Sequence, residues 1–468
     1  MFVKLCLSML LPLSIGFLLL DICLSMERKI PEVFLLKCSL AVGLGFGITS
    51  CSYFLCLLTV GPTITGLILS EAGMFVLLMI LFIYTGKAPT SNEYDIGNEK
   101  TLHDLKLSRI LSIGFGFVLL SAFANFVALE LHTPHGAWDS WAIWNLRARF
   151  IFRGGEYWTD AFSNLLSTYQ HPDYPLLVPL TVARSWSYIG KETQVVPITV
   201  AFFFTFAIAG IIYSALTILR SKSQGILAGL FLMSTTIFIF LGAYQYGDVP
   251  LGFFFLSSIV FIFFQERFPK NYNLSLLAGA MAGLSGWTKN EGLLFLLCLF
   301  LVCSSLTVFS SDRKEHMKQL AYLALGSVPF LLMLIYFKIN LAPPNEIVSK
   351  ETIMREVIGK LGDYSRYVKI LKAFIIYALL NFPHFLLLIV YPLIFRIKID
   401  DTSKKSIIIS SVVLVLMFTG FFLVYQITPH DLDWHLEKSL PRLLAQLWPS
   451  ILFTYFMIVR TPEEALMK

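Results

Sequence analysis

Two short polar segments, residues 135–150 and 171–175, contain residue types that could bind phosphate and move a proton. The first begins at His135 and holds Asp139 with three tryptophans and two arginines, namely Trp138, Trp141, Trp144, Arg147 and Arg149. The second reads His171-Pro172-Asp173-Tyr174-Pro175. A partly desolvated carboxylate can act as a general base toward a hydroxyl group, and arginine can bind phosphate through two parallel hydrogen bonds. Tryptophan and arginine also suit a membrane–water boundary.

Asp139 allows two interpretations. It could be the N-cap of an interfacial amphipathic helix on which Trp138, Trp141 and Asn145 share one face by their i, i+3 and i+4 spacing. It could instead be a general base, kept from full hydration by the neighbouring tryptophans. Asp173 and Tyr174 at the far end of the loop are candidates for binding a substrate, with the tyrosine stacking on a sugar.

Two further constellations follow. Asp248, in Tyr246-Gly247-Asp248-Val249-Pro250, could be an N-cap or a substrate-binding carboxylate. Lys289, in Gly286-Trp287-Thr288-Lys289-Asn290-Glu291-Gly292, interrupts an apolar stretch. The lysine could hold an anionic group and be oriented by Glu291, or the segment could be no more than a tight turn.

A C-terminal polar segment, residues 428–442, offers a phosphate site. Ser439 suits an N-cap with Pro441 in the first turn, so we expect the last span to begin there with free N–H groups. Arg442 and His435 would add to that helix start, which is a good environment for phosphate. The alternative is an arginine that extends to the membrane surface, with exposed histidines.

The composition is that of a membrane protein. The chain has 468 residues, of which 56% are hydrophobic and 14% charged, whereas soluble proteins are about 25% charged. The net charge of +6 does not indicate nucleic acid as a partner, because the basic residues lie in short loops. Seven cysteines lie in or at the ends of apolar runs without CxxC spacing, which indicates buried thiols.

The apolar runs predict an all-α polytopic bundle of about thirteen spans, each near the ~20 residues that cross a bilayer. They are residues 5–25, 33–58, 62–84, 108–131, 193–219, 224–243, 249–265, 272–288, 291–310, 318–340, 370–396, 406–427 and 440–459. The first run has no cleavage site after it, so we expect it to remain as a span. We interpret residues 175–190, interrupted by Arg184 and two prolines, as a re-entrant or interfacial helix. With these spans, we expect the lipid bilayer to be a partner of the protein.

Orientation follows from the short basic loops. Met26–Glu32, Arg220–Ser223, Gln265–Lys270, Asp312–Lys318 and Arg396–Lys405 fall on one side if 175–190 does not span, and that side should be the cytoplasm. The loops with the candidate residues then share the outer face. The predicted divisions are accessory helices 1–84, a cytoplasmic linker 85–107, a catalytic core 108–310 with outer loop 132–192, and C-terminal helices 311–468 with outer loops 341–368 and 428–439.

The predicted outer loop 341–368 is itself basic, although the orientation rule places basic loops on the cytoplasmic side. Its basic residues, with one just beyond it, are Lys350, Arg355, Lys360, Arg366 and Lys369. It could form a lid over a lipid phosphate, or a solvated helix.

The order of these motifs resembles the GT-C membrane glycosyltransferases, in particular the protein mannosyltransferase and aminoarabinose transferase group (family 39 and its bacterial relatives). The resemblance covers about 108–310, and 433–449 resembles one bacterial branch. It implies a polyprenyl-phosphate sugar donor, an outer-face active site, inversion at the anomeric carbon, and Asp139 as the catalytic aspartate. Two departures stand out: Ser140 follows Asp139 where the family often has a second acidic residue, and Asp173 replaces the second proline of a His-Pro-Pro motif.

With this resemblance, we expect Arg442, His435 and Lys289 to bind the donor phosphate and a glycan, lipid or protein to be the acceptor. We expect the bacterial cytoplasmic (inner) membrane, with the active site on the extracytoplasmic face. No cofactor is certain, although Asp139, Asp173 and Asp248 could converge on a divalent metal. The alternatives are a transporter or flippase for a lipid-linked or anionic substrate, and a ligase or polymerase of lipid-linked glycans. A transporter would favour charges at midspan and an inverted repeat, which the sequence does not offer.

Overall fold

A computed structural model describes residues 2–24, 30–85, 102–166, 170–344, 353–382 and 384–466. Within these ranges the secondary structure is helical, and the single β-bridge joins Ile397 to Val459. The predicted all-α class is therefore confirmed. Most of the predicted linker 85–107 lies outside the described residues, and so does Lys350.

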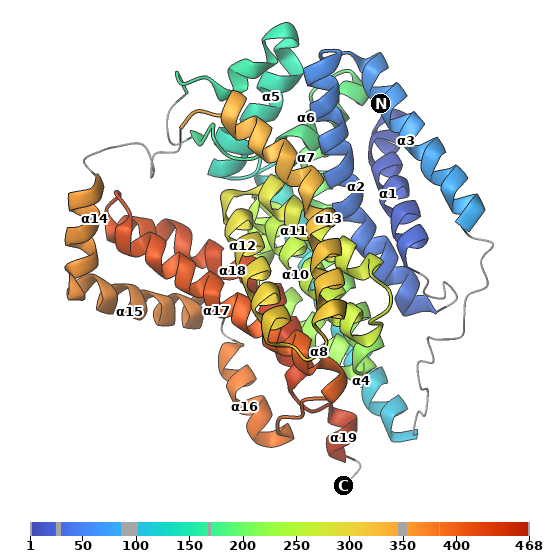
Figure 1. Ribbon diagram of the computed structural model, residues 1–468, viewed down its shortest axis with the longest axis vertical. Coiled ribbons are helices and arrows are strands. Elements are labelled where there is room, and N and C mark those ends of the chain that lie inside the picture. The colour runs from blue at the N-terminus through green and yellow to red at the C-terminus, as the bar shows by residue number, and fades with distance from the viewer. Residues whose placement is uncertain are drawn as a thin grey trace.

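The N-terminal half contains helices α1 to α9 (Figure 1). Their bounds are α1 Phe2–Cys23, α2 Pro31–Thr59, α3 Ile64–Thr85, α4 Leu102–His132, the π-helix η1 Ser140–Trp144, α5 Asn145–Arg153, the 3-10 helix η2 Gly155–Phe162, α6 Leu177–Ile189, α7 Val195–Leu219, α8 Lys222–Met233 and α9 Thr236–Ala243.

The C-terminal half contains α10 to α19. Their bounds are α10 Asp248–Arg267, α11 Asn273–Thr288, α12 Asn290–Phe309, α13 Arg313–Asn340, α14 Ile353–Gly362, α15 Tyr364–Asn381, α16 Phe385–Phe395, the short 3-10 helix η4 Asp401–Ser403, α17 Lys404–Ile427, α18 Leu432–Ile458 and α19 Pro462–Leu466.

Among the described residues, nine helices are long and apolar enough to cross a membrane, or eleven if two bent pairs are each one span. The bent pairs are α8 with α9, at 66°, and α15 with α16, at 82°. Two of the thirteen predicted spans, 272–288 and 440–459, correspond to α11 and to part of α18, which do not meet that test. Several long apolar helices make this an integral membrane protein.

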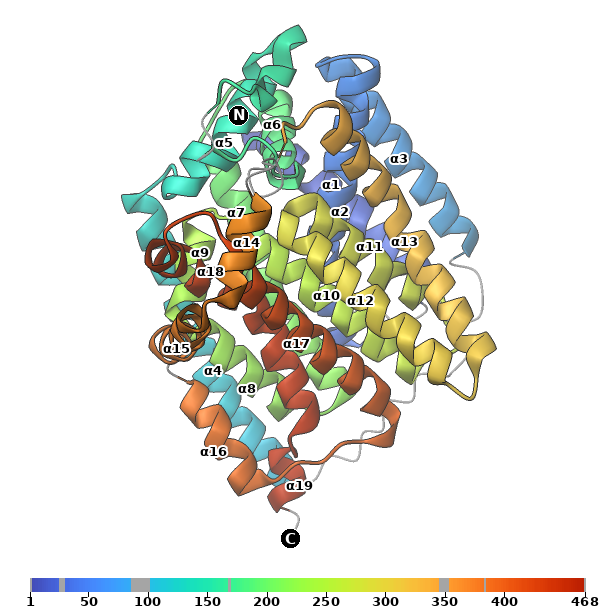
Figure 2. The same ribbon diagram turned by 60° about the vertical axis from the view of Figure 1, so that its left-hand side comes forward.

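Helix α10 is the centre of the bundle. Its residues 248–265 are buried throughout, and it packs against α7, α11, α17 and α18. Figure 2 shows α17 crossing in front of this central part of the bundle. A helix that is apolar on all sides and covered on all sides suits this place. Its first residue, Asp248, is held at one end of the bundle.

Helices α11 and α13 approach each other closely through glycine. A Cβ at Gly279 would lie 1.9 Å from the carbonyl oxygen of Leu323, and one at Gly326 would lie 2.0 Å from that of Leu276. Small residues let helix backbones approach where lipid supplies little hydrophobic driving force. The contact fixes α13 beside the turn that carries Lys289.

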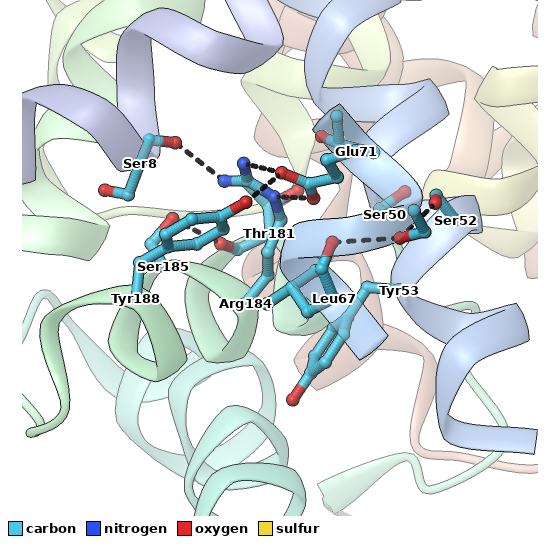
Figure 3. A network of polar contacts seen from close by, with 12 residues as sticks. Ser8, Ser50, Ser52, Tyr53, Leu67, Glu71, Thr181, Arg184, Ser185 and Tyr188 are labelled. Atoms are coloured by element: carbon cyan, nitrogen blue, oxygen red, sulfur yellow. Dashed lines mark hydrogen bonds and ion pairs between the residues drawn. The ribbon is translucent and has the colours of Figure 1, made fainter. Parts of the chain in front are cut away.

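A buried ion pair joins the N-terminal helices to α6 (Figure 3). Arg184 and Glu71 are both fully buried and pair through two hydrogen bonds. Arg184 also donates to the carbonyl of Ser8 at 2.6 Å, and Tyr188 donates to Glu71 at 2.7 Å. Arg184, which interrupts the apolar run 175–190, therefore holds α1 and α3 against α6. Helix α6 has 13 residues, which is too short to cross a bilayer.

The basic loops come together at the end of the bundle opposite Asp248. Arg220 pairs with Asp400, and residues of 265–270, 312–318 and 396–405 line one cavity. Asn273 donates to the carbonyl of Cys23, next to the first loop. The end that faces the cytoplasm remains a prediction from charge.

Candidate functional site

Six polar side chains from four parts of the chain meet at the start of α10. We call this set the carboxylate–cation cluster, and its members are Asp139, Asp248, Lys289, Glu291, Arg442 and Gln446. Asp139 precedes η1, and Asp248 is the first residue of α10. Lys289 and Glu291 lie in the turn between α11 and α12 and at the start of α12, while Arg442 and Gln446 lie one turn apart in the middle part of α18.

Asp248 is the hub of the cluster. It is 1% exposed. Its Oδ1 accepts from Lys289 Nζ at 3.0 Å and from Gln446 Nε2 at 2.5 Å. Its Oδ2 accepts from Nε and Nη2 of Arg442 at 3.2 and 2.9 Å. The N-cap interpretation is wrong, because Asp248 lies inside the helix and Gly247 is the residue before it.

Arg442 bridges the two aspartates. Its Nη2 donates to Oδ2 of Asp139 at 2.5 Å as well as to Asp248, and its guanidinium lies 4.6 Å from the ring centre of Tyr246. Within the described residues we find no hydrogen bond from its Nη1. The Arg442 side chain is 22% exposed, so part of it is accessible to solvent.

Asp139 is the more open aspartate. Its side chain is 13% exposed, and within the described residues only Oδ2 makes a side-chain hydrogen bond. It precedes η1 without a side-chain capping bond, so the N-cap interpretation is wrong here too. The predicted shared face is also wrong: Asn145 is 3% exposed whereas Trp138 and Trp141 are 56% and 43% exposed. The π-turn explains this, because Asn145 N–H bonds to Ser140 five residues back, so this turn contains an extra residue and Asn145 falls on a different face.

Lys289 is buried in the turn between α11 and α12. It pairs with Asp248 at 3.0 Å and with Glu291 at 2.9 Å. Burial lowers the pKa of Lys289, but the charges of Asp248 and Glu291 outweigh it and hold this pKa above its ordinary value. Glu291 therefore contacts the Lys289 ammonium, as expected. In this structure the ammonium is paired with two carboxylates of the protein itself.

A second group of residues lies beside the cluster. Asp173 accepts from Nδ2 of Asn290 at 3.1 Å, and Lys338 donates to Oδ1 of Asn290 at 3.0 Å and pairs with Asp173 at 3.4 Å. Because Asn290 stands between Lys289 and Glu291, this group and the cluster share one turn. Asp173 therefore fixes the 171–175 loop to α12 and α13.

Arg147 holds the same loop from the other side. It is buried and donates to the carbonyl oxygens of Tyr174 and His171 at 2.6 and 2.5 Å. His171 has a positive φ of 42° and stacks on Tyr174 with ring centres 4.5 Å apart. Burial lowers the pKa of His171. The Tyr174 ring centre lies 5.9 Å from Lys289 Nζ, which brings the loop to the edge of the cluster.

Among the predicted site residues, Trp138, Trp141 and Arg149 lie away from the cluster contacts, as does His435. Trp138 and Trp141 pack edge to face with ring centres 4.5 Å apart on the surface. Arg149 lies near Glu192 and His135, each at 3.5 Å. Arg149, His135 and Trp141 border a surface pocket of about 520 Å³ that the segment 132–136 completes.

The predicted helix start at Ser439 is wrong. Helix α18 begins at Leu432, and Asp431 caps it by accepting from Trp434 N–H at 2.9 Å. Arg442 therefore lies inside a continuous helix, away from free N–H groups. His435 contacts Thr428 at 2.9 Å and does not contact the cluster, and burial lowers its pKa to about 4.

The basic segment 353–369 packs on the ends of α17 and α18. Lys360 donates to the carbonyl of Thr428 at 3.0 Å, Arg366 to that of Tyr425 at 3.0 Å, and Lys369 pairs with Asp433 at 2.6 Å. Lys360 and Arg366 therefore donate hydrogen bonds to carbonyl groups of the protein, and Lys369 forms an exposed ion pair with Asp433. Neither feature favours a lid over a phosphate.

Sequence reasoning missed Gln446, Asn290 and Lys338. Gln446 is one turn after Arg442 in an apolar helix, so the i, i+4 spacing offered a signal. Lys338 ends a long apolar run, as a lysine at a membrane surface does, and only the packing of α13 shows its partner.

No group of three or more His, Cys, Asp or Glu side chains within the described residues is placed to hold a metal ion. Asp139 and Asp248 are both bound to Arg442, and Asp173 lies in the neighbouring group. No family model, curated protein or solved structure matches this chain.

Proposed function

We propose that this protein is an inverting glycosyltransferase, which moves a sugar from a polyprenyl-phosphate donor to an acceptor hydroxyl at the extracytoplasmic face of the membrane. The observation that carries the proposal is the bond between the partly exposed Asp139 and the partly exposed Arg442, beside a buried Asp248 whose two oxygens are both bonded. A base for the acceptor and a fork for the phosphate are then neighbours.

In this mechanism Arg442 binds the donor phosphate. Asp248 fixes the guanidinium through Nε and Nη2, which leaves Nη1 to donate to a phosphate oxygen. Charge-assisted bonds to the leaving phosphate stabilise the charge that develops as the glycosidic bond breaks. Lys289, which is buried against two carboxylates, positions Asp248 and Glu291.

Phosphate binding would also free the base. The Oδ2 atom of Asp139 accepts a hydrogen bond from Arg442, so the acceptor hydroxyl must compete with the guanidinium for that oxygen. A phosphate that draws Nη2 away from Asp139 leaves the carboxylate free to take the acceptor's proton. The donor would then have to be in place before the acceptor is activated.

The surface pocket at 132–136 could receive the acceptor. It is lined by Trp141, His135 and Arg149 among others, and it lies in the same loop as Asp139. An indole face can stack on a sugar, while histidine and arginine can bond to its hydroxyl groups. This arrangement favours a glycan acceptor.

The test is Asp139→Asn. The amide keeps the shape but cannot take the proton, so turnover should fall by roughly 10²–10⁴. Donor binding should be unchanged or tighter, because Arg442 loses a competing carboxylate. Transfer from a panel of radiolabelled polyprenyl-phosphate sugars would be measured in membranes with matched protein levels, with Asp433→Asn as the control at an exposed aspartate.

Near-normal transfer by Asp139→Asn would show that Asp139 is not the base. If neither Asp139→Asn nor Arg442→Lys lowered transfer, the glycosyltransferase mechanism would be wrong and the transporter alternative would be taken up.

A further inference from the structure

A cavity of about 240 Å³ lies at the end of the bundle opposite the carboxylate–cation cluster. It is enclosed by α10, α11, α12, α13 and α17. Glu266, on its wall, follows Asp248 by eighteen residues along α10, which corresponds to roughly 27 Å of helix. The cavity is therefore separated from the cluster by nearly the thickness of a bilayer.

The lining of this cavity is divided between apolar and charged side chains. Leu323 and Ile409 are each 4% exposed and form its buried wall. Lys405, Glu315 and His316 are partly exposed, so the charged groups lie toward the surface. A cavity with an apolar interior and a charged opening at a membrane surface suits an amphiphile.

Some of these polar atoms lack partners within the described residues. Oε1 of Glu315 and Nδ1 of His316 are buried without a hydrogen bond. Lys405 Nζ makes a single long bond, to Oε1 of Gln319 at 3.3 Å. Buried polar atoms are ordinarily bonded, so groups of this kind at a cavity indicate a bound polar partner.

Neighbouring polar groups are already satisfied. Both oxygens of Glu266 accept backbone N–H groups at the start of α17, from Lys405 at 2.9 Å and Ser406 at 2.6 Å. Oε2 of Glu315 accepts from Tyr272 at 2.8 Å. What remains for a ligand is one lysine ammonium, one histidine nitrogen and one carboxylate oxygen.

These remaining groups select a ligand that carries both signs of charge. A plain anion would meet the carboxylates of Glu315 and Asp312, and a plain cation would meet Lys405. A metal ion is not favoured either, since no suitable ligand group occurs in the described part of the chain.

We propose that this cavity binds the phosphoethanolamine headgroup of a membrane phospholipid. The phosphate lies on Lys405 and His316, the ammonium donates to Oε1 of Glu315, and the apolar wall at Leu323 and Ile409 faces the glycerol and the first methylene groups of the acyl chains. The lipid thereby joins the ends of α10, α13 and α17. The proposal does not depend on the reaction at the other end of the bundle.

The experiment measures lipid binding to the delipidated full-length protein by native mass spectrometry and by the melting midpoint. The probes are dioleoyl phosphatidylethanolamine, phosphatidylglycerol and phosphatidylcholine, which differ in the ammonium group. Wild type should prefer phosphatidylethanolamine, because glycerol carries no positive charge and choline cannot donate a hydrogen bond. Lys405→Met and Glu315→Gln should each weaken that lipid by roughly ten- to a hundredfold, as expected for one charge-assisted bond.

The controls are the exposed neighbours Lys404→Met and Asp401→Asn, which should bind as wild type does. Glu315→Gln should leave phosphatidylglycerol binding intact or strengthen it, because only the ammonium uses that carboxylate and an anionic headgroup is repelled by it. This result would stand even if Lys405→Met failed to fold. Equal binding of the three lipids by wild type, or unchanged selectivity in both variants, would overturn the proposal. Protection by soluble O-phosphoethanolamine as strong as by the lipid would overturn the assignment to a lipid.

Discussion

Replacing Asp248 by asparagine should destabilise the protein strongly, although the two side chains have nearly the same shape. In the sequence this aspartate resembles a helix cap, and a cap tolerates asparagine with little loss. In the structure it is 1% exposed and accepts from Lys289, Arg442 and Gln446. The two interpretations therefore predict different outcomes for one variant.

The magnitude follows from what the change leaves behind. Asparagine can accept at one atom only, and its NH₂ group would point at a donor. Lys289 would keep Glu291 and Arg442 would keep Asp139, so neither cation becomes wholly unpaired. Breaking one side of a buried ion pair costs about 3–5 kcal/mol, and these surviving partners place the expected loss near 3 kcal/mol.

The free energy of unfolding would be measured in mixed micelles for wild type and for the two variants Asp248→Asn and Asp433→Asn. Asp433 also pairs with a lysine, Lys369, but its side chain is 69% exposed, so its loss should cost no more than about 1 kcal/mol. A loss at Asp248 as small as that at Asp433 would refute the reasoning and restore the cap interpretation.

Three further predictions concern other parts of the chain. Arg184→Met or Glu71→Leu alone should lower stability by about 3–5 kcal/mol while the double variant recovers part of it, and a melting series that shows simple additivity would contradict this. Because burial lowers the pKa of His435 from 6.5 to about 4, the unfolded chain binds the proton first, so stability should fall as pH drops from about 6.5 toward 4, and His435→Gln should flatten that dependence in pH-resolved melts. Single cysteines should react with an external impermeant maleimide at Asp160 or Glu437 and not at Lys222 or Lys314, and the reverse pattern would invert the topology.

The membrane helices could be predicted well from the sequence because an apolar run long enough to cross a bilayer has few other uses. The breaks were harder to see. The run 224–243 reads as one span, but the helices meet at 66° between Met233 and Thr236. Nothing in apolar periodicity records such a bend, since both halves remain largely apolar.

The partners of the charged residues could not be predicted from sequence alone. Asp139, Asp248, Lys289 and Glu291 were chosen because charges are costly inside an apolar chain, but their pairing depends on how α10, α11 and α18 pack. Local rules misled at Asp248 and Ser439, where residue types that favour capping instead serve tertiary contacts. At Asn145 the single extra residue of a π-turn reversed the predicted face.

The charge of the cluster bears on how it could work. Three carboxylates and two cations leave one net negative charge, so a phosphate could not simply be added to it. It would have to replace a carboxylate at a cation, and Asp248 and Glu291 are held by Lys289 and Gln446. Asp139 is held by Arg442 alone among the described side chains. The aspartate that is easiest to displace is therefore the one that our proposal needs as the base.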